Sequence, residues 1–383
     1  MSIPKKHHLV INSMPQRNGG GLTIMTGLVD AFAKQTKVDL KISVVCSADE
    51  TRENFETQGV ADSVLQPLRN ASAIKRFIWA NRSLGKYVDD LKPDVYFAFN
   101  QFTPGITCPQ VVFHTNLLRF MPIPPGVSLK QRVADMARNR AAKMALKKAD
   151  ANVYESKYLR QCGEAIYKRA GVKNPVIYHG LPDELASATP DENQPPFNEG
   201  QIVSITNYNE HKDNTTLLNT LAELVKRWPD VDWQLKIAGG IFPERWRPYE
   251  TLADNLGVRD RVEWLGFFDQ NQLTDLLKRS LCLVSTSKVE SFCLVGIEAM
   301  ARGCPSIVAD CASMPESIED AGILVEPGNP RAFAEAIVNL KQTPELRDKI
   351  VDAGFRRIRK LNWKTCGEQF GDVFYNTLAT RAP

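Results

Sequence analysis

Short apolar runs alternate with longer amphipathic segments along the chain, and this alternation predicts its secondary structure. The apolar runs have the length and the polar boundaries of buried strands, whereas the longer segments repeat apolar residues at helical spacing. Helical spacing is clearest in residues 22–34, 73–91, 215–228 and 363–379. The predicted strands are 8–14, 40–47, one within 60–68, 94–99, 110–115, 151–156, 201–206, 233–239, 262–266, 281–286, 305–310 and 322–326.

Strands that alternate with helices predict α/β domains in which helices cover both faces of a parallel sheet. The alternation stops in residues 181–200, a Pro-, Asp- and Glu-rich stretch typical of an interdomain linker. We therefore predict two Rossmann-like, doubly wound domains, residues 1–180 and 201–364, facing a central cleft. Ligands bind at the carboxyl ends of such strands, so a donor and an acceptor would enter from opposite sides.

Composition and charge narrow the class of protein. No apolar run reaches the roughly 18 residues that a membrane-spanning helix needs, and residues 1–6 lead into the first strand without a cleavable apolar segment. The net charge of +4 is too weak to predict a nucleic-acid partner. The eight cysteines are widely spaced and lack CxxC pairs, which favours reduced thiols and a cytoplasmic location.

The most informative stretch is residues 288–310, in which Glu290 and Glu298 are eight positions apart. In a continuous helix this spacing corresponds to a rise of about 12 Å, so the two carboxylates cannot share one proton. They can instead contact two separate polyhydroxy groups of a long ligand that has a diphosphate between them. Residues 291–295 would then lie at a helix N-terminus, where free N–H groups and the helix dipole favour a phosphate.

This stretch resembles the E-x7-E signature of retaining glycosyltransferases of the GT-B fold, in particular the family four group. The resemblance extends over most of the chain and is strongest in residues 281–310 and 314–330. It implies that the last segment, residues 365–383, is a helix that crosses back to the N-terminal domain. It also implies transfer of a hexose from a nucleotide-diphosphate sugar to a glycan, a lipid-linked acceptor or a small molecule, as in polysaccharide biosynthesis.

The resemblance implies a role for each candidate site residue. The catalytic set is Glu290 at the hexose hydroxyls, Lys212 at the leaving diphosphate and His114 at further sugar hydroxyls, with Asn116 as a weaker candidate. Glu298 would contact the ribose. The remaining donor-binding positions act through backbone groups and are Gly19, Gly20, Gly21, Phe292, Cys293, Leu294, Val295, Gly239, Gly266 and Phe267. The alternatives are ordinary ones: a tight glycine turn, a structural histidine and a surface lysine.

The sequence departs from the resembled family after the strand 201–206. The family has Gly-Arg at this place, whereas this chain has Thr206 and Asn207, so the arginine is missing. Only Lys212 matches, and a protonated His211 would supply part of the lost positive charge. The departure concerns donor affinity and rate more than the class of reaction.

No metal or other cofactor is predicted. Asp230 and Asp232 form a DxD pattern, which binds a metal in a different glycosyltransferase fold, but they lie between a predicted helix and the next strand. This place is far from the carboxyl ends of the strands, so we interpret the pair as a solvated turn. No other cluster has the spacing of metal ligands.

Residues 128–148 carry seven basic residues against the single acid Asp135, with a modest Ala-rich apolar stripe at helical spacing. We interpret this segment as a helix with a charged outer face. The alternative is weak contact with anionic lipid, or with a lipid-linked acceptor, at the inner face of the membrane.

Two other functions compete with glycosyl transfer. One is a nucleotide-sugar epimerase of the same fold, which the context of Glu290 and Glu298 disfavours. The other is a non-catalytic protein that binds nucleotide sugars or glycans, which the missing arginine at Asn207 supports.

Overall fold

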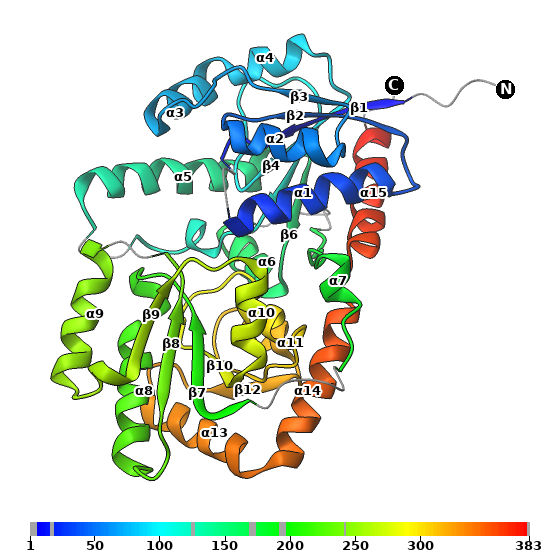
Figure 1. Cartoon of the computed structure of the whole chain (residues 1–383). Coiled ribbons are helices and arrows are strands. Elements are labelled where there is room, and N and C mark those ends of the chain that lie inside the picture. The colour runs from blue at the N-terminus through cyan, green and yellow to red at the C-terminus, as the bar shows by residue number, and fades with distance from the viewer. Residues whose placement is uncertain are drawn as a thin grey trace. The chain divides into compact units, whose positions relative to one another are not determined.

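The computed structural model describes residues 6–15, 19–123, 127–167, 174–190, 197–240 and 243–380. The chain divides into two compact units (Figure 1). Unit 1 comprises Met1–Pro182 and Leu361–Pro383, and unit 2 comprises Asp183–Lys360. Unit 1 is therefore built from two separate stretches of the chain.

Unit 1 contains a six-stranded parallel sheet in the order β3-β2-β1-β4-β5-β6. Its strands are β1 (His7–Asn12), β2 (Leu40–Val45), β3 (Ser63–Leu65), β4 (Val95–Phe99), β5 (Gln110–His114) and β6 (Ala151–Tyr154). Its helices are α1 (Gly19–Lys34), α2 (Asp49–Gln58), α3 (Ala73–Arg82), α4 (Leu84–Asp90), α5 (Leu129–Lys148), α6 (Lys157–Ile166), α15 (Trp363–Ala379) and the 3₁₀ turn η1 (Leu117–Arg119).

Unit 2 repeats this plan with the sheet order β12-β11-β10-β7-β8-β9, again with all strands parallel. Its strands are β7 (Asn198–Ile205), β8 (Gln234–Ala238), β9 (Val262–Gly266), β10 (Ser280–Ser285), β11 (Ser306–Ala309) and β12 (Gly322–Val325). Its helical elements are α7 (Asp183–Ala186), α8 (Asn214–Arg227), α9 (Pro243–Asn255), α10 (Gln270–Lys278), α11 (Leu294–Met300), α12 (Met314–Ile318), α13 (Pro330–Gln342), α14 (Pro344–Arg359), η2 (Glu210–Lys212) and η3 (Arg259–Arg261).

The prediction of two doubly wound α/β domains is confirmed, and every predicted strand is present. Within the predicted linker, α7 forms and β7 already begins at Asn198, while residues 191–196 lie outside the described part. The segment 73–91 is not one helix, because it breaks at Ser83. The break allows the rings of Trp79 and Tyr87 to approach to 5.6 Å. In a straight helix, residues eight apart are separated by about 12 Å along the axis.

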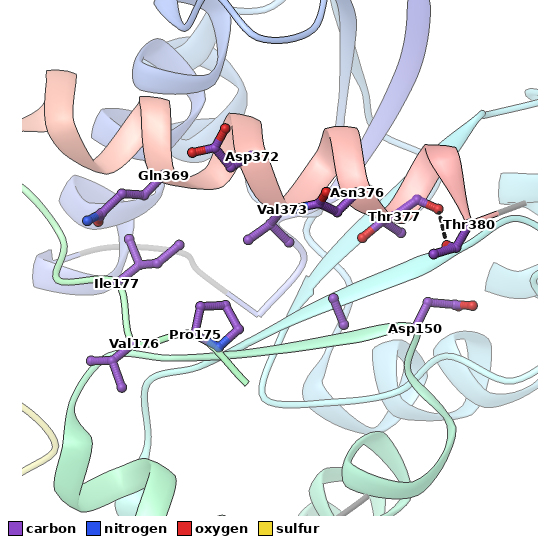
Figure 2. A pocket seen from close by; sticks show the side chains of 11 residues that line it. Asp150, Pro175, Val176, Ile177, Gln369, Asp372, Val373, Asn376, Thr377 and Thr380 are labelled. Atoms are coloured by element: carbon purple, nitrogen blue, oxygen red, sulfur yellow. Dashed lines mark hydrogen bonds between the residues drawn. The ribbon is translucent and has the colours of Figure 1, made fainter. Parts of the chain in front are cut away.

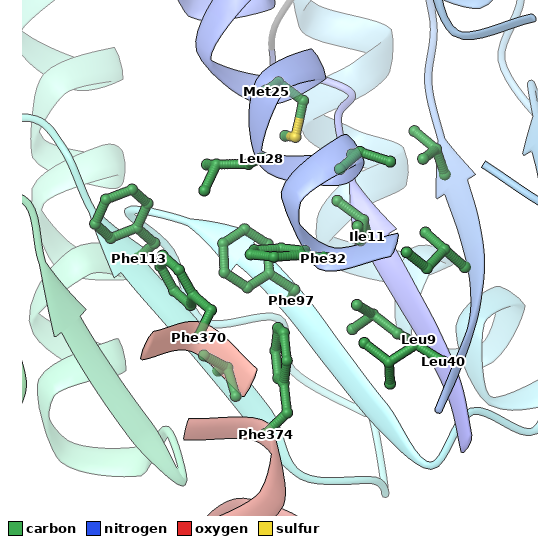
Figure 3. Packing of buried hydrophobic residues seen from close by; sticks show 14 of the residues in the cluster. Leu9, Ile11, Met25, Leu28, Phe32, Leu40, Phe97, Phe113, Phe370 and Phe374 are labelled. Atoms are coloured by element: carbon green, nitrogen blue, oxygen red, sulfur yellow. The ribbon is translucent and has the colours of Figure 1, made fainter. Parts of the chain in front are cut away.

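The final helix, α15, packs into the core of unit 1 rather than onto its surface. Phe370 and Phe374 are fully buried and belong to the cluster formed by the strands and α1 (Figure 3). The ring of Phe32 in α1 contacts both of them edge to face, with centroids 5.0 Å away in each case. Close helix packing also explains Gly27 in α1, where a Cβ atom would lie 2.3 Å from the indole of Trp363. The helix thus joins the end of the chain to its first half.

None of the helices in the described ranges combines the length and the hydropathy that a membrane-spanning segment needs.

Replacing Phe374 by Ala tests the contribution of α15 to unit 1. Removing a fully buried aromatic side chain leaves a cavity, so we expect the free energy of unfolding to fall by about 3–5 kcal/mol. The neighbouring Tyr375 is 59% exposed, and Tyr375→Ala should change the free energy by less than about 0.5 kcal/mol. Urea denaturation of both variants makes the comparison. Equal effects would mean that α15 is not part of the core.

Candidate functional site

Both sheets have the same order relative to their first strand, and this order defines a switch point in each. In unit 1 the chain moves outward from β1 to one side and then continues from β4 on the other side. In unit 2 the corresponding pair is β7 and β10. Loops diverge at such a point, and doubly wound sheets bind their ligands in the crevice between the two loops.

Lys212 and Glu290 meet at the switch point of unit 2. Lys212 ends η2 in the loop after β7, and Glu290 lies in the loop after β10. The Lys212 ammonium donates to the Glu290 carboxylate over 2.5 Å, and the two side chains are only 17% and 16% exposed. The structure thus brings together the two residues that the sequence assigned to diphosphate and hexose.

Hydrogen bonds between the two loops hold this pair in place. The Thr286 hydroxyl donates to the carbonyl of Asp213 over 2.9 Å, and the backbone N–H of Lys288 donates to the carbonyl of His211 over 2.7 Å. From a third loop, between β11 and α12, the Ser313 hydroxyl donates to the carbonyl of Glu290 over 2.7 Å. Because each loop is bonded to the other, the ion pair is fixed from both sides.

Two charged residues of this site were missed by the sequence analysis. Asp213 adopts a left-handed conformation with φ of 48°, and its side chain accepts from the backbone N–H of Thr216 to cap α8. The ammonium of Lys288 lies 2.9 Å from the Asp213 carboxylate. An Asp immediately before an apolar helical run is a recognisable N-cap signal, but nothing local indicates its partner.

The positive charge suggested for His211 is disfavoured. Burial and the neighbouring ammonium of Lys212 lower the pKa of His211, while Glu290 raises it to a smaller extent. The neutral imidazole is therefore favoured at neutral pH. The side chain of Asn207 accepts from the backbone N–H of Asn209 over 3.0 Å, so it supports the loop and supplies no charge.

Glu298 is separated from Glu290 by the start of a helix. The helix α11 begins at Leu294, so the segment between the two acids is not helical throughout. Burial raises the pKa of Glu298, and the charge of Arg302 lowers it to a smaller extent. Among the described residues, no side chain donates a hydrogen bond to its carboxylate. Arg302 instead donates to the backbone carbonyl of Glu298 over 2.9 Å.

The residues between these acids form the entry to α11. The backbone N–H of Cys293 donates to the hydroxyl of Ser317 over 3.2 Å. Burial raises the pKa of the Cys293 thiol to about 12, so this cysteine is neutral and unsuited to nucleophilic attack. Phe292 is buried, whereas Leu294 and Val295 are partly exposed in the first turn of the helix.

Glycines at the ends of β8 and β9 are required by their backbone geometry. Gly239 has φ of 142°, and a Cβ atom there would lie 1.8 Å from the carbonyl oxygen of Thr206. Its N–H donates to the carbonyl of Gly266, which has φ of 76°. Phe267 follows and is 80% exposed. These positions lie at the same carboxyl edge of the sheet as Lys212.

In unit 1, His114 ends β5 and is fully buried. Its Nε2 lies 2.8 Å from Oδ1 of Asn152, and its ring stacks on Tyr154. Burial lowers the pKa of His114 to about 4, and the hydrogen bond with Asn152 raises it less. The ring has no exposed surface, so contact with sugar hydroxyls would require a rearrangement. Asn116 caps η1 by accepting from the N–H of Leu118.

The three glycines after β1 lie within a helix rather than in a loop. Gly19, Gly20 and Gly21 form the first turn of α1, three residues earlier than predicted, while residues 16–18 lie outside the described part. The N–H groups of a first turn have no partner within the helix, and this first turn carries no acidic residue. Their geometry therefore still suits an anion.

The described residues contain no cluster of candidate metal ligands. No group of three or more His, Cys, Asp or Glu residues there could hold a metal ion. Asp230 and Asp232 are exposed in the turn between α8 and β8, at the amino end of β8.

A pocket of about 680 Å³ lies between α15 and residues 175–177 in unit 1 (Figure 2). It includes Asp150, which precedes β6, so it opens away from the carboxyl edge.

The whole chain has the fold of solved glycosyltransferase structures. It matches the sucrose-phosphate synthase of Thermosynechococcus elongatus with a TM-score of 0.74, covering 98% of this chain and 100% of that one at 19% identity. It matches Alr3699/HepE of Anabaena, solved in complex with UDP and glucose, with a TM-score of 0.73 at 16% identity, covering 96% and 99%. These likenesses show the two-domain α/β architecture known as GT-B.

The family match lies within unit 2. Residues 188–357 match the family model described as glycosyl transferases group 1. The chain is 27% identical over 172 residues to a D-inositol 3-phosphate glycosyltransferase of Corynebacterium glutamicum (strain R), which covers 44% of this chain and 41% of that protein. The matched part spans less than two thirds of the length of each of the first curated relatives. Lys212, Glu290 and Glu298 all lie within the family match.

The buried His114 predicts a pH dependence of stability. Its pKa is about 6.5 in the unfolded chain and about 4 in the folded one, so the unfolded state binds the proton first as the pH falls. The contribution of neutral His114 to the free energy of unfolding is therefore fully present above pH 6.5. It is lost as the pH falls towards 4, and the loss amounts to about 3 kcal/mol.

The variant His114→Gln should lack this component, so its free energy of unfolding should fall less between pH 7 and pH 4.5 than that of the natural chain. Urea denaturation followed by circular dichroism measures both slopes. An unchanged slope in His114→Gln would contradict the assignment.

Replacing Gly239 by Ala tests the close approach at the end of β8. The new Cβ atom would clash with the Thr206 carbonyl and would also adopt a disfavoured φ, so we expect a loss of about 3 kcal/mol or more. Gly257 has φ of 69° with nothing within 4 Å, so Gly257→Ala should cost only about 1 kcal/mol. Thermal unfolding of both variants separates the clash from the conformational strain. A cost in Gly239→Ala no larger than in the control would argue against the clash.

Proposed function

We propose that the protein is a retaining glycosyltransferase that transfers a hexose from a nucleotide-diphosphate sugar to an acceptor. The observation that carries the proposal is the pair of Lys212 and Glu290 at the switch point of unit 2. The family match over residues 188–357 supports it, because that match includes both residues. The resemblance of residues 290–298 to the E-x7-E signature supports the stereochemical outcome.

Negative charge develops on the diphosphate as the bond to the sugar breaks, and stabilising that charge is the main electrostatic demand of the reaction. The ammonium of Lys212 would meet this demand, while the carboxylate of Glu290 would accept hydrogen bonds from hexose hydroxyls. In the resting chain each of these charges satisfies the other. Donor binding would exchange one ion pair for two sets of contacts with a single ligand, so each charged group would keep hydrogen-bond partners.

The other end of the donor would lie at Glu298. Its carboxylate is partly buried and accepts no hydrogen bond from the described side chains, so the two hydroxyls of a ribose would satisfy it. Gly239 and Gly266 allow the backbone to come close to the ligand, and Phe267 would lie beside the base. The backbone of residues 292–295 would contact the sugar and the diphosphate.

We further propose that the reaction needs no metal ion, since Lys212 supplies the positive charge at the diphosphate. The acceptor would bind to unit 1, near the carboxyl ends of β1, β4 and β5. The eight cysteines are free thiols, which supports a reducing, cytoplasmic compartment.

The second candidate is a non-catalytic protein that binds nucleotide sugars. It is favoured by Asn207, which stands where the resembled family has an arginine. The two candidates differ in turnover, because a binding protein would hold the donor without cleaving it.

The experiment compares Lys212→Ala with Glu290→Ala. UDP, GDP and ADP are titrated by calorimetry, beginning with UDP because Alr3699/HepE was solved with UDP and glucose. We expect Lys212→Ala to weaken binding of the nucleotide roughly tenfold or more, since a charged hydrogen bond to phosphate is lost. Glu290→Ala should bind the nucleotide at least as well as the natural chain, because its removal releases the Lys212 ammonium.

The second measurement is turnover, followed as release of the nucleotide from the hexose donor that carries the nucleotide found to bind. No acceptor is needed, because slow hydrolysis of the donor by water is sufficient to show turnover. Turnover should fall by about 100-fold or more in Glu290→Ala, whereas Asp230→Ala, at an exposed turn, should keep it. NMR of the released hexose should show the anomer of the donor. Nucleotide binding without any turnover in the natural chain would favour the non-catalytic candidate. Absence of nucleotide binding would refute both.

A further inference from the structure

A groove in unit 1 combines an apolar lining with concentrated positive charge. It has a volume of about 710 Å³ and lies between residues 121–123 and one face of α5. This volume is within the range of about 300–1,000 Å³ that is typical of small-molecule sites. The apolar part of its lining includes Met121, Ile123, Met136 and Met144.

The charged part of the lining has a single sign. Arg140, Lys143, Lys147 and Lys148 all line the groove, and no Asp or Glu is among the described residues that line it. The site therefore complements an anion, and several close positive charges favour a phosphate over a neutral sugar.

The face of α5 that lines the groove continues as an exposed apolar stripe. Leu129, Val133 and Met136 are 78%, 58% and 59% exposed, and they are spaced at four and three residues, so they lie on one side of the helix. Arg140 and Lys143 continue these steps of four and three residues after Met136, so they lie on the same side of the helix. This side of the helix is thus apolar in its first half and basic in its second half.

The groove lies close to the edge where an acceptor is expected. Its wall, residues 121–123, follows η1, which begins three residues after the carboxyl end of β5. The guanidinium of Arg119 in η1 lies 3.3 Å from the carboxylate of Asp135 in α5. This ion pair is largely buried, with side chains 17% and 20% exposed, so the wall is anchored to the helix.

We propose that this groove binds the phosphate-bearing head and the adjoining chain of a lipid, and that this lipid carries the acceptor of the proposed transfer. The inference rests on the proposed function and adds the acceptor class to it. Arg140 and Lys143 hold the phosphate, while Met136 and Met144 contact the hydrocarbon next to it. The exposed Leu129 and Val133 extend the apolar contact beyond the groove. The hydrocarbon chain of such a lipid complements the apolar half of the surface, and its charged head complements the basic half. A free sugar phosphate complements only the basic half.

The test measures binding of dodecyl phosphate, kept below its critical micelle concentration, to the full chain by calorimetry. We expect Arg140→Gln/Lys143→Gln to weaken binding about 30-fold, since each basic residue at a lipid phosphate contributes by a factor of roughly five. The matched control is Lys130→Gln/Arg132→Gln, which removes the same charge from α5 at positions outside the groove lining. It should change the affinity by less than about twofold.

Two further measurements identify the ligand chemistry. Inorganic phosphate should bind at least about 100-fold more weakly than dodecyl phosphate, because burial of even a few methylene groups gives that difference. Met136→Gln should weaken binding of dodecyl phosphate without changing binding of phosphate. Equal affinities for the two ligands would overturn the inference, as would equal losses in the two double variants. Tighter binding of a single-stranded RNA oligonucleotide would overturn it in favour of nucleic acid.

Nucleotide titration of the same variants separates this inference from the proposed function. Arg140→Gln/Lys143→Gln should bind the donor nucleotide like the natural chain, because that site lies in unit 2. If the nucleotide binds and dodecyl phosphate does not, only the acceptor class is wrong. If the natural chain binds no nucleotide, the proposed function itself is wrong.

Discussion

The parallel pairing of β7 with β10 is the constraint on which the candidate site depends. In this pair Ile202 lies opposite Cys282 and Val203 opposite Leu283, so both strands end at the same edge of the sheet. The loops that follow carry Lys212 and Glu290, which are 78 positions apart in the sequence and within hydrogen-bond distance in the fold. Without this register the two loops would not lie at the same edge of the sheet, and the two side chains would not be in contact.

The surroundings of the pair explain why a charged site is compatible with a partly buried position. A carboxylate removed from water is costly unless a partner satisfies it, and Lys212 fulfils this role for Glu290. Hydrogen bonds from Thr286 and Ser313 to backbone carbonyls fix the two loops, so the backbone that carries the two charges is already held in place. Such preorganisation is what stabilisation of a leaving diphosphate requires.

The two units share a strand order but present different chemistry. Unit 2 places opposite charges at its switch point, whereas unit 1 buries a neutral His114 at the end of β5 and exposes a basic and apolar groove beside α5. The core of unit 1 also depends on α15, whose Phe370 and Phe374 pack against Phe32. One fold thus offers a charged site in one unit and an amphipathic surface in the other.

The sequence by itself determined the strands and the two α/β units, because apolar periodicity is a local property. Only the tertiary structure decided the ion pair of Lys212 with Glu290, the burial of His114 and the break at Ser83, which allows the rings of Trp79 and Tyr87 to approach each other. The groove likewise needs residues 121–123 to meet α5. Burial and charge pairing depend on neighbours that are distant along the chain, and no local pattern records which neighbours those are.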